Sequence, residues 1–383
     1  MDTIKLSRAL DQIGGDFLCN VLSLFKLIKQ RKEEQINGAQ STAIQKIIKN
    51  SQKILVINLW GLGDAVLTLP LIEEINHRFP KAQVDVLATK RVEKIYCDQK
   101  NIDDVLLLEN KKNIFKFNHY DLVFDTEHYL NTSALAAFYL GKKTIGYDHG
   151  QRAKLYNYPV DYNDKQHIVH TYLDLLRKLF PKINNPKELV KLSYCKEDQE
   201  EVIELLRTNN IGEKDFVVGI CVSSAESAHS RMWAKERFAK LADSLIEKHK
   251  AKIIFVSGPN EFETNESVKR LMKNPSLNAA KFMNVKRTIA IIDRCRLFIS
   301  NDTGPMHVAA AQGVPTIGLF CPNTPIRYAP YGSKNISIYK PVLPKPCINV
   351  HKGTIPDCSN HNHMANIQVE DVLDAAERII NNL

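Results

Sequence analysis

From Lys53 onward, short apolar runs alternate with longer stretches in which apolar residues recur every three or four positions. The runs lie at 53–59, 83–88, 104–108 and 120–125, and a helical stretch at 65–78 separates the first two. Continuous apolar runs are typical of strands buried on both faces. The alternation of strand and helix therefore predicts a parallel sheet with helices on both faces over residues 51–185.

The same pattern starts again after a polar, proline-containing stretch near 181–190. Strands are predicted at 216–222, 252–256, 297–300 and 315–320, and helices at 235–249 and 304–312. We expect an α/β protein of two doubly wound, Rossmann-like domains, residues 51–185 and 186–365, with a C-terminal helix at 366–383. The cleft between two such domains is the default ligand site.

Residues 1–50 precede the first domain and are expected to form a basic helical extension. Their apolar residues follow helical spacing on one face, and the Gly14-Gly15 pair is expected to break or kink the helix. One interpretation is a helix that lies on an anionic membrane surface. The other is a helical arm that packs on its own domain or on another subunit. The apolar face consists of Leu6, Leu10, Ile13, Phe17, Val21, Leu24 and Ile28.

Composition narrows the partners and the compartment. The 383 residues carry 52 basic and 43 acidic side chains, a formal charge of +9, which suits anionic partners such as nucleotides, phosphorylated glycolipids or membrane surfaces. The basic residues are dispersed without an aromatic-interleaved patch, which argues against nucleic acid. Eight scattered cysteines, no apolar run of membrane-spanning length and no signal-peptide pattern predict a cytoplasmic protein with reduced, buried thiols.

The first strand ends in a glycine turn that carries an acidic residue. A dinucleotide-binding fingerprint after Gly61 and Gly63 would need a third glycine where the chain has Val66, so a nicotinamide cofactor is not favoured. Asp64 stands at the carboxyl end of a parallel strand, where a general base could take a proton from an acceptor hydroxyl. The alternative role for Asp64 is the N-cap of a helix that starts at Ala65.

A second polar turn joins strand 297–300 to the helix at 304–312. Free backbone N–H groups at such a turn, together with the helix dipole, would hold a diphosphate. His307 either donates a hydrogen bond to a phosphate or packs as a core histidine. For Asp302 and Thr303 the alternative to ligand binding is that one of them caps the helix.

Two segments resemble the bacterial heptosyltransferases, the ADP-heptose:lipopolysaccharide glycosyltransferases of family 9. They are residues 53–70 with the GLGD turn and residues 298–320, FISNDTGPMHVAAAQGVPTIGLF. The resemblance implies a GT-B fold and an inverting, metal-independent transfer of heptose to a lipid A-linked core acceptor, without a cofactor. It also implies that Asp64 is the base. The donor-binding residues that it implies are Asp302, Thr303, Gly304, Met306 and His307.

Two further donor-side positions follow from the resemblance. The family carries a lysine two residues before a tryptophan, and here Arg231 stands in that place. Arginine keeps the charge and can grip a phosphate with two hydrogen bonds, although a surface arginine is the alternative. A glutamate after strand 252–256 contacts the nucleoside in the family, and Glu261 or Glu263 could fill that role.

Two alternative functions remain open from the sequence. A related transferase could use another nucleotide sugar on a protein or a different glycan, or the chain could bind nucleotide sugars without catalysis.

The basic N-terminal helix suggests a peripheral position on the inner membrane. A metal or redox site is also conceivable near the C-terminus, since soft ligands gather there, although we expect reduced or solvated residues instead. These ligands are Cys347, His351, Cys358, His361 and His363.

Overall fold

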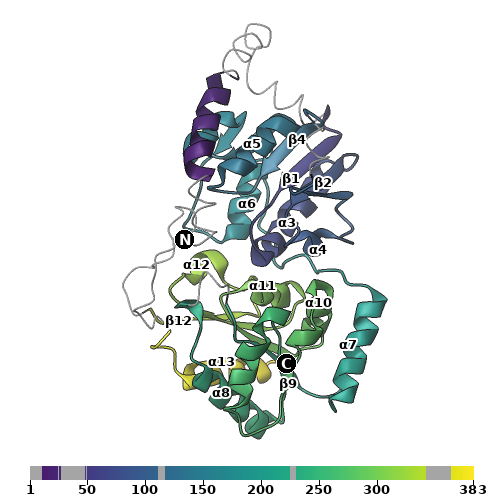
Figure 1. Cartoon of the computed structure of the whole chain (residues 1–383), viewed down its shortest axis with the longest axis vertical. Coiled ribbons are helices and arrows are strands. Elements are labelled where there is room, and N and C mark those ends of the chain that lie inside the picture. Colours follow the sequence, from purple (N-terminus) through teal and green to yellow (C-terminus); the bar gives the residue numbers. More distant parts are fainter. Residues whose placement is uncertain are drawn as a thin grey trace. The chain divides into compact units, whose positions relative to one another are not determined.

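The computed structural model describes residues 11–24, 26, 48, 50–110, 117–224, 230–341 and 364–383. The chain divides into two compact units, Met1–Asn185 and Pro186–Leu383, and each contains one six-stranded parallel sheet with flanking helices (Figure 1). The expected α/β class with two doubly wound sheets is therefore confirmed.

In unit 1 the strands follow the order β3-β2-β1-β4-β5-β6 and all pairs are parallel. The strands are β1 Lys53–Ile57, β2 Gln83–Ala88, β3 Asp104–Leu107, β4 Tyr120–Asp125, β5 Gly141–Tyr147 and β6 Tyr158–Val160. The helices are α3 Leu62–Arg78, α4 Glu93–Tyr96, α5 Asn131–Leu140, the 3₁₀ helix η2 Gln151–Leu155 and α6 Ile168–Arg177. The chain passes from β1 to β2 through α3 and from β4 to β5 through α5, so the two connections run toward opposite edges of the sheet. Right-handed crossovers then place α3 and α5 on opposite faces of the sheet.

Unit 2 repeats this order as β12-β11-β10-β7-β8-β9. Its strands are β7 Val217–Cys221, β8 Lys252–Phe255, β9 Leu277–Asn278, β10 Leu297–Asn301, β11 Thr316–Phe320 and β12 Ile336–Tyr339. Its helices are α7 Lys196–Thr208, α8 Lys235–His249, η4 Pro259–Glu261, α9 Phe262–Lys269, η5 Ala280–Phe282, α10 Val285–Asp293, α11 Gly304–Ala311, α12 Pro325–Tyr328 and α13 Val369–Ile380. The amphipathic α13 contributes its apolar face to the core of this unit.

The strand order places a topological switch point in each sheet. The chain reverses direction across the sheet between β1 and β4 in unit 1 and between β7 and β10 in unit 2. Ligands of open parallel sheets bind at the carboxyl ends of the strands beside such a point, because the two connecting loops diverge there. The glycine turn follows β1 and the second polar turn follows β10, so both flank a switch point.

The N-terminal helix, residues 11–24, lies against α5 (Figure 1). It runs through Gly14 and Gly15, so of the expected break or kink at this pair the break is wrong. Gly15 is instead a packing position, because a Cβ atom there would lie 2.5 Å from Cβ of Asn131. The absence of a side chain lets the two helices approach closely, and this contact offsets the low helix propensity of glycine.

Within the described residues, no helix is long and apolar enough to cross a membrane.

Candidate functional site

Asp64 lies in the first turn of α3, directly after the turn that follows β1. The helix begins at Leu62 with Gly61 at its N-cap position, so Gly63 is already helical and Asp64 is not the N-cap residue. The capping alternative for a helix starting at Ala65 is therefore wrong. The carboxylate is partly exposed and accepts a hydrogen bond from Tyr172 Oη at 3.3 Å. The N-terminus of the helix favours its negative charge.

Glu127 is a second carboxyl group at this edge, and the sequence reasoning missed it. It follows β4 and is 2% exposed, and its Oε1 accepts a hydrogen bond from Leu59 N at 2.6 Å. Burial raises the pKa of Glu127 to about 8, and the negative charges of Asp125 and Asp64 add to this effect. Glu127 therefore ties the loop after β4 to the turn that carries Asp64. It holds its proton at neutral pH.

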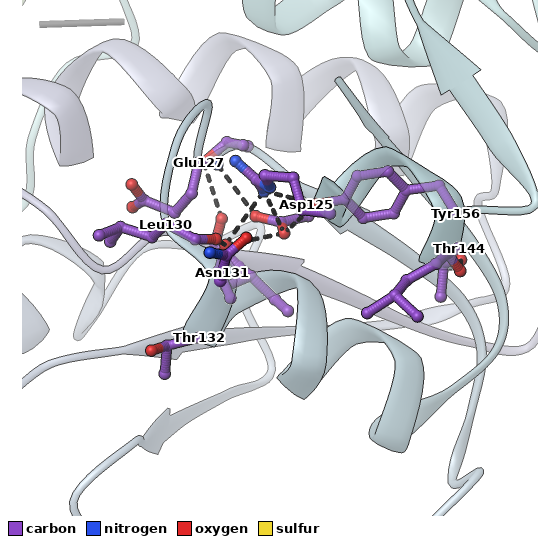
Figure 2. Close-up of polar contacts among 12 residues, drawn as sticks. Asp125, Glu127, Leu130, Asn131, Thr132, Thr144 and Tyr156 are labelled. Atoms are coloured by element: carbon purple, nitrogen blue, oxygen red, sulfur yellow. Dashed lines mark hydrogen bonds and ion pairs between the residues drawn. The ribbon is translucent and has the colours of Figure 1, made fainter. Parts of the chain in front are cut away.

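A buried ionic cluster anchors the loop that carries Glu127 (Figure 2). Asp125 accepts hydrogen bonds from Arg152 Nη2 at 2.8 Å, Tyr156 Oη at 2.7 Å and Ser133 Oγ at 2.9 Å. Its other carboxylate oxygen accepts from Glu127 N at 3.0 Å. The side chains of Asp125 and Arg152 are fully buried, at 0% and 1% exposure. Removing either one would therefore leave the charge of the other buried without a partner charge.

Aromatic rings border the two carboxyl groups. Trp60 packs edge-on against Tyr129 with ring centroids 5.3 Å apart, and His128 stacks on Tyr162 at the same centroid distance. These residues follow β1, β4 and β6, so they gather at the carboxyl edge of the sheet. The edge thus combines apolar ring surface with acidic groups.

Asn301 organises the corresponding edge of unit 2. Its Nδ2 donates to the Val222 carbonyl oxygen at 2.9 Å, and its Oδ1 accepts from Trp233 N at 3.1 Å. Trp233 is buried, and its indole N–H donates to the Ile367 carbonyl oxygen at 2.9 Å. One amide at the end of β10 therefore connects the end of β7 to the segment that carries Arg231.

Arg231 is held over the turn after β10 by an ion pair. Its Nη1 lies 3.2 Å from Asp302 Oδ2, and the two side chains are 17% and 4% exposed, so the surface-arginine alternative is wrong. Asn323 Nδ2 also donates to Asp302 Oδ2, at 2.9 Å, a partner that the sequence reasoning missed. The Nε of Arg231 is buried and makes no hydrogen bond to the described residues. One N–H group of Arg231 is therefore unsatisfied among the described residues.

The remaining residues of this turn occupy different environments. Thr303 holds the N-cap position of α11 without a side-chain capping bond, so the structure does not support a cap from this side chain. Gly304 begins the helix. Met306 is fully buried, and its Sδ would lie 2.7 Å from a Cβ atom placed at Gly318, so its side chain packs between helix and sheet.

His307 is buried but carries an unsatisfied ring atom. It is 3% exposed, and its Nδ1 makes no hydrogen bond to the described residues. Burial, helped by the charge of Arg231, lowers the pKa of His307 to about 3. The ring is therefore neutral at neutral pH, and one of its nitrogens carries a proton that it can donate.

The two glutamates after β8 differ in orientation. Glu261 accepts from Gly258 N at 2.8 Å. Burial raises the pKa of Cys221, which ends β7, and the negative charge of Glu261 adds to this effect. Glu263 is 79% exposed and lies 3.7 Å from Arg270. Glu261 therefore belongs to the carboxyl edge of the sheet, whereas Glu263 lies on the outer surface of α9.

The Cys/His cluster of residues 347–363 lies outside the described residues. In the parts of the chain that the structure covers, no group of three His, Cys, Asp or Glu side chains is arranged to hold a metal ion. Among the described cysteines, Cys195 is exposed, which corrects the expectation that the thiols are buried.

Comparisons with known proteins converge on one family. The family model described as "Glycosyltransferase family 9 (heptosyltransferase)" matches residues 112–354, more than half of the chain. The chain is 24% identical over 353 residues to lipopolysaccharide core heptosyltransferase OpsX of Haemophilus influenzae, which covers 86% of this chain and 97% of that protein.

Solved structures agree on the fold. A family 9 glycosyltransferase from Veillonella parvula matches with a TM-score of 0.74 and 24% identity over 87% of this chain and 98% of that one. The E. coli ADP-heptose lipopolysaccharide heptosyltransferase II matches with a TM-score of 0.70 and 18% identity, over 86% of this chain and 99% of that one.

Proposed function

The chain belongs to glycosyltransferase family 9, the heptosyltransferases, and on this premise we propose that it transfers heptose from ADP-heptose to a lipid A-linked core acceptor, with inversion at the anomeric carbon. ADP-heptose and lipopolysaccharide are named for the E. coli neighbour, and the lipopolysaccharide core for the H. influenzae relative. The proposed acceptor is lipid-linked, so we infer that the reaction takes place at the cytoplasmic face of the inner membrane.

The observation that supports the proposal best is a pair of buried polar side chains near the turn after β10, each with one atom that makes no hydrogen bond to the described residues. Arg231 is fixed by Asp302 yet keeps an unbonded Nε, and His307 keeps an unbonded Nδ1. Buried polar atoms without partners are costly, so such atoms at a helix N-terminus suit an anionic ligand that completes them. We assign the donor diphosphate to Arg231 and to the backbone N–H groups of Thr303 and Gly304.

The remaining roles follow from position. Glu261 reaches the carboxyl edge and is assigned to the nucleoside, while Glu263 is given no role. Met306 is assigned to the donor site only through its backbone, because its side chain is buried in the core.

In the proposed mechanism Asp64 takes the proton of an acceptor hydroxyl while that oxygen attacks the anomeric carbon. A single displacement of this kind inverts the configuration. As the glycosidic bond breaks, negative charge grows on the leaving ADP. Arg231 and the amides at the start of α11 then stabilise the transition state more than the ground state. These groups supply the positive charge that a divalent cation would otherwise provide, so we propose a metal-independent reaction.

The decisive assay measures ADP release from ADP-heptose in the presence of core acceptor, with donor affinity measured separately by calorimetry. We expect Asp64→Asn to lower kcat by about 10²–10⁴ and to leave donor affinity unchanged, because Asp64 and the donor residues belong to different units. Asp104→Asn serves as a control, since Asp104 is exposed at the start of β3. Turnover by Asp64→Asn near that of the control would refute the base assignment.

Two further arms test the donor and the metal requirement. Selective binding of ADP-sugars over UDP- and GDP-sugars is expected, and preference for another nucleotide would refute the donor. Binding without ADP release on any acceptor would point instead to a non-catalytic protein. Unchanged turnover in EDTA is expected, and loss that Mg²⁺ restores would refute metal independence.

A further inference from the structure

The N-terminal helix contacts unit 1 through its small and polar face. Gly15, Cys19 and Ser23 are buried on that face. Asp11 accepts hydrogen bonds from the backbone N–H groups of Asn131 and Thr132 at the start of α5, at 2.9 and 2.8 Å. Carboxylates at a helix N-terminus are stabilised by the free N–H groups there, so these contacts fix which side of the helix points outward.

The outward side is apolar. Ile13, Phe17 and Leu24 are 77%, 70% and 62% exposed, and at 100° per residue they fall within an arc of about 40°. Leu18, which follows Phe17 in the chain and lies outside this arc, is 48% exposed. A surface helix normally turns its apolar stripe toward its own domain, so this helix is inverted. We call Ile13, Phe17 and Leu24 the apolar ridge.

The ridge is not an accident of a generally apolar surface. Eleven large apolar side chains are exposed in the described parts of the chain, and four of them belong to this one helix. Contiguous exposed apolar surface of this kind marks a binding face.

Charge around the ridge identifies the kind of partner. The acidic side chains Asp11 and Asp16 are both hydrogen-bonded to Asn131, so they are turned toward unit 1. Lys154 borders the helix instead: it is exposed and donates to Asn20 Oδ1 at 2.9 Å. The first 50 residues contain eight basic and five acidic residues.

An apolar ridge with an exposed lysine beside it, in a net basic N-terminal segment, complements an anionic bilayer. There the apolar side chains enter the boundary of the acyl chains while basic side chains meet lipid phosphates. A second copy of the chain is a poorer partner, because a two-fold interface through this helix would bring two net basic N-terminal segments together.

We propose that the N-terminal helix docks unit 1 onto an anionic phospholipid surface through the apolar ridge. The choice of partner rests on the proposed function in one respect, since a lipid-linked acceptor lies in such a surface. Docking concentrates the enzyme where the acceptor is and turns the search for it into diffusion along the membrane. The helix supplies attachment only and takes no part in the chemistry.

The test is co-sedimentation of the full chain with vesicles of phosphatidylethanolamine and phosphatidylglycerol, compared with vesicles of phosphatidylcholine. We expect binding to the anionic vesicles that falls at high salt, and a loss of at least about tenfold in the triple variant Ile13→Ser/Phe17→Ser/Leu24→Ser. The control is Ile326→Ser in unit 2, which removes an equally exposed apolar side chain (59%) and should bind like the unaltered chain.

Activity provides a second readout. The triple variant should release ADP normally with a delipidated core oligosaccharide but lose activity with acceptor embedded in vesicles. Equal vesicle binding by the triple variant and the unaltered chain would overturn the proposal. So would a dimer that the triple variant dissolves without any change in vesicle binding, because the partner would then be a second copy. Vesicle binding needs no catalysis, so vesicle binding without transfer would refute the proposed function and leave the docking intact.

Discussion

Replacing the buried carboxyl of Glu127 by an amide should remove a large part of the pH dependence of stability. The folded protein holds a proton on Glu127 up to about pH 8, whereas the unfolded chain releases it near the ordinary pKa of 4.5. Between these values the folded state binds one more proton than the unfolded state. The stability of the unaltered chain therefore falls as pH rises through this window.

The size of the effect follows from the two pKa values. Each pH unit in the window changes the free energy of unfolding by about 1.4 kcal/mol, so from pH 5 to pH 8 Glu127 alone removes about 4 kcal/mol. Glu127→Gln abolishes this contribution, because an amide does not ionise. Its side-chain oxygen can still accept the hydrogen bond from Leu59 N.

The measurement is urea unfolding of both proteins at pH 5, 6, 7 and 8. Taking the difference between variant and unaltered chain cancels the pH dependence of the other groups. From pH 5 to pH 8 we expect the free energy of unfolding of Glu127→Gln to rise by about 4 kcal/mol relative to that of the unaltered chain. Any effect of the substitution that is the same at every pH does not change this shift. A difference that stays constant from pH 5 to pH 8 would refute the reasoning, since Glu127 would then ionise at its ordinary pKa.

Three other outcomes are expected. Arg152→Met should destabilise unit 1 by about 3–5 kcal/mol in urea unfolding, because it leaves a buried carboxylate without compensation, and a loss below 1 kcal/mol would contradict a charged pair. Gly15→Val should release the N-terminal helix and expose residues 11–24 to protease, whereas Gly14→Val, where no atom lies within 4 Å of the added Cβ, should not. Glu261→Gln should weaken ADP binding in calorimetry while Glu263→Gln leaves it unchanged; equal effects would reject the choice between them.

Local pattern was sufficient for most of the fold. The strands at 83–88 and 120–125 and the helix at 235–249 have the predicted bounds. Buried strands and amphipathic helices are each recognisable from the spacing of their apolar residues in the sequence. The glycine turn and the polar turn were also visible, since a strand that passes into a helix through glycine or Asp-Thr-Gly is a short-range signal.

The start of α3 shows where local pattern misleads. Asp64 has the chemistry of an N-cap, but Gly61 takes that position three residues earlier, so the carboxylate projects from the first turn. Caps are chosen by the geometry of the entering chain, and side-chain preference decides only among positions that this geometry allows.

The N-terminal helix shows a different limit. Periodicity groups Ile13, Phe17 and Leu24 on one face, but it does not say which face meets the protein. Here hydrogen bonds from the start of α5 and the close approach at Gly15 decide the orientation.

The sequence by itself determined the two α/β repeats, the turns that end β1 and β10, and the family to which they point. Only the tertiary structure brought Glu127 beneath the turn that carries Asp64 and Asn323 against Asp302, because both contacts depend on which strands are neighbours in a sheet. Strand order is set by pairing between distant segments, and no local signal encodes it. The raised pKa of Glu127 has the same origin, since burial, which fold topology creates, is what penalises its charge.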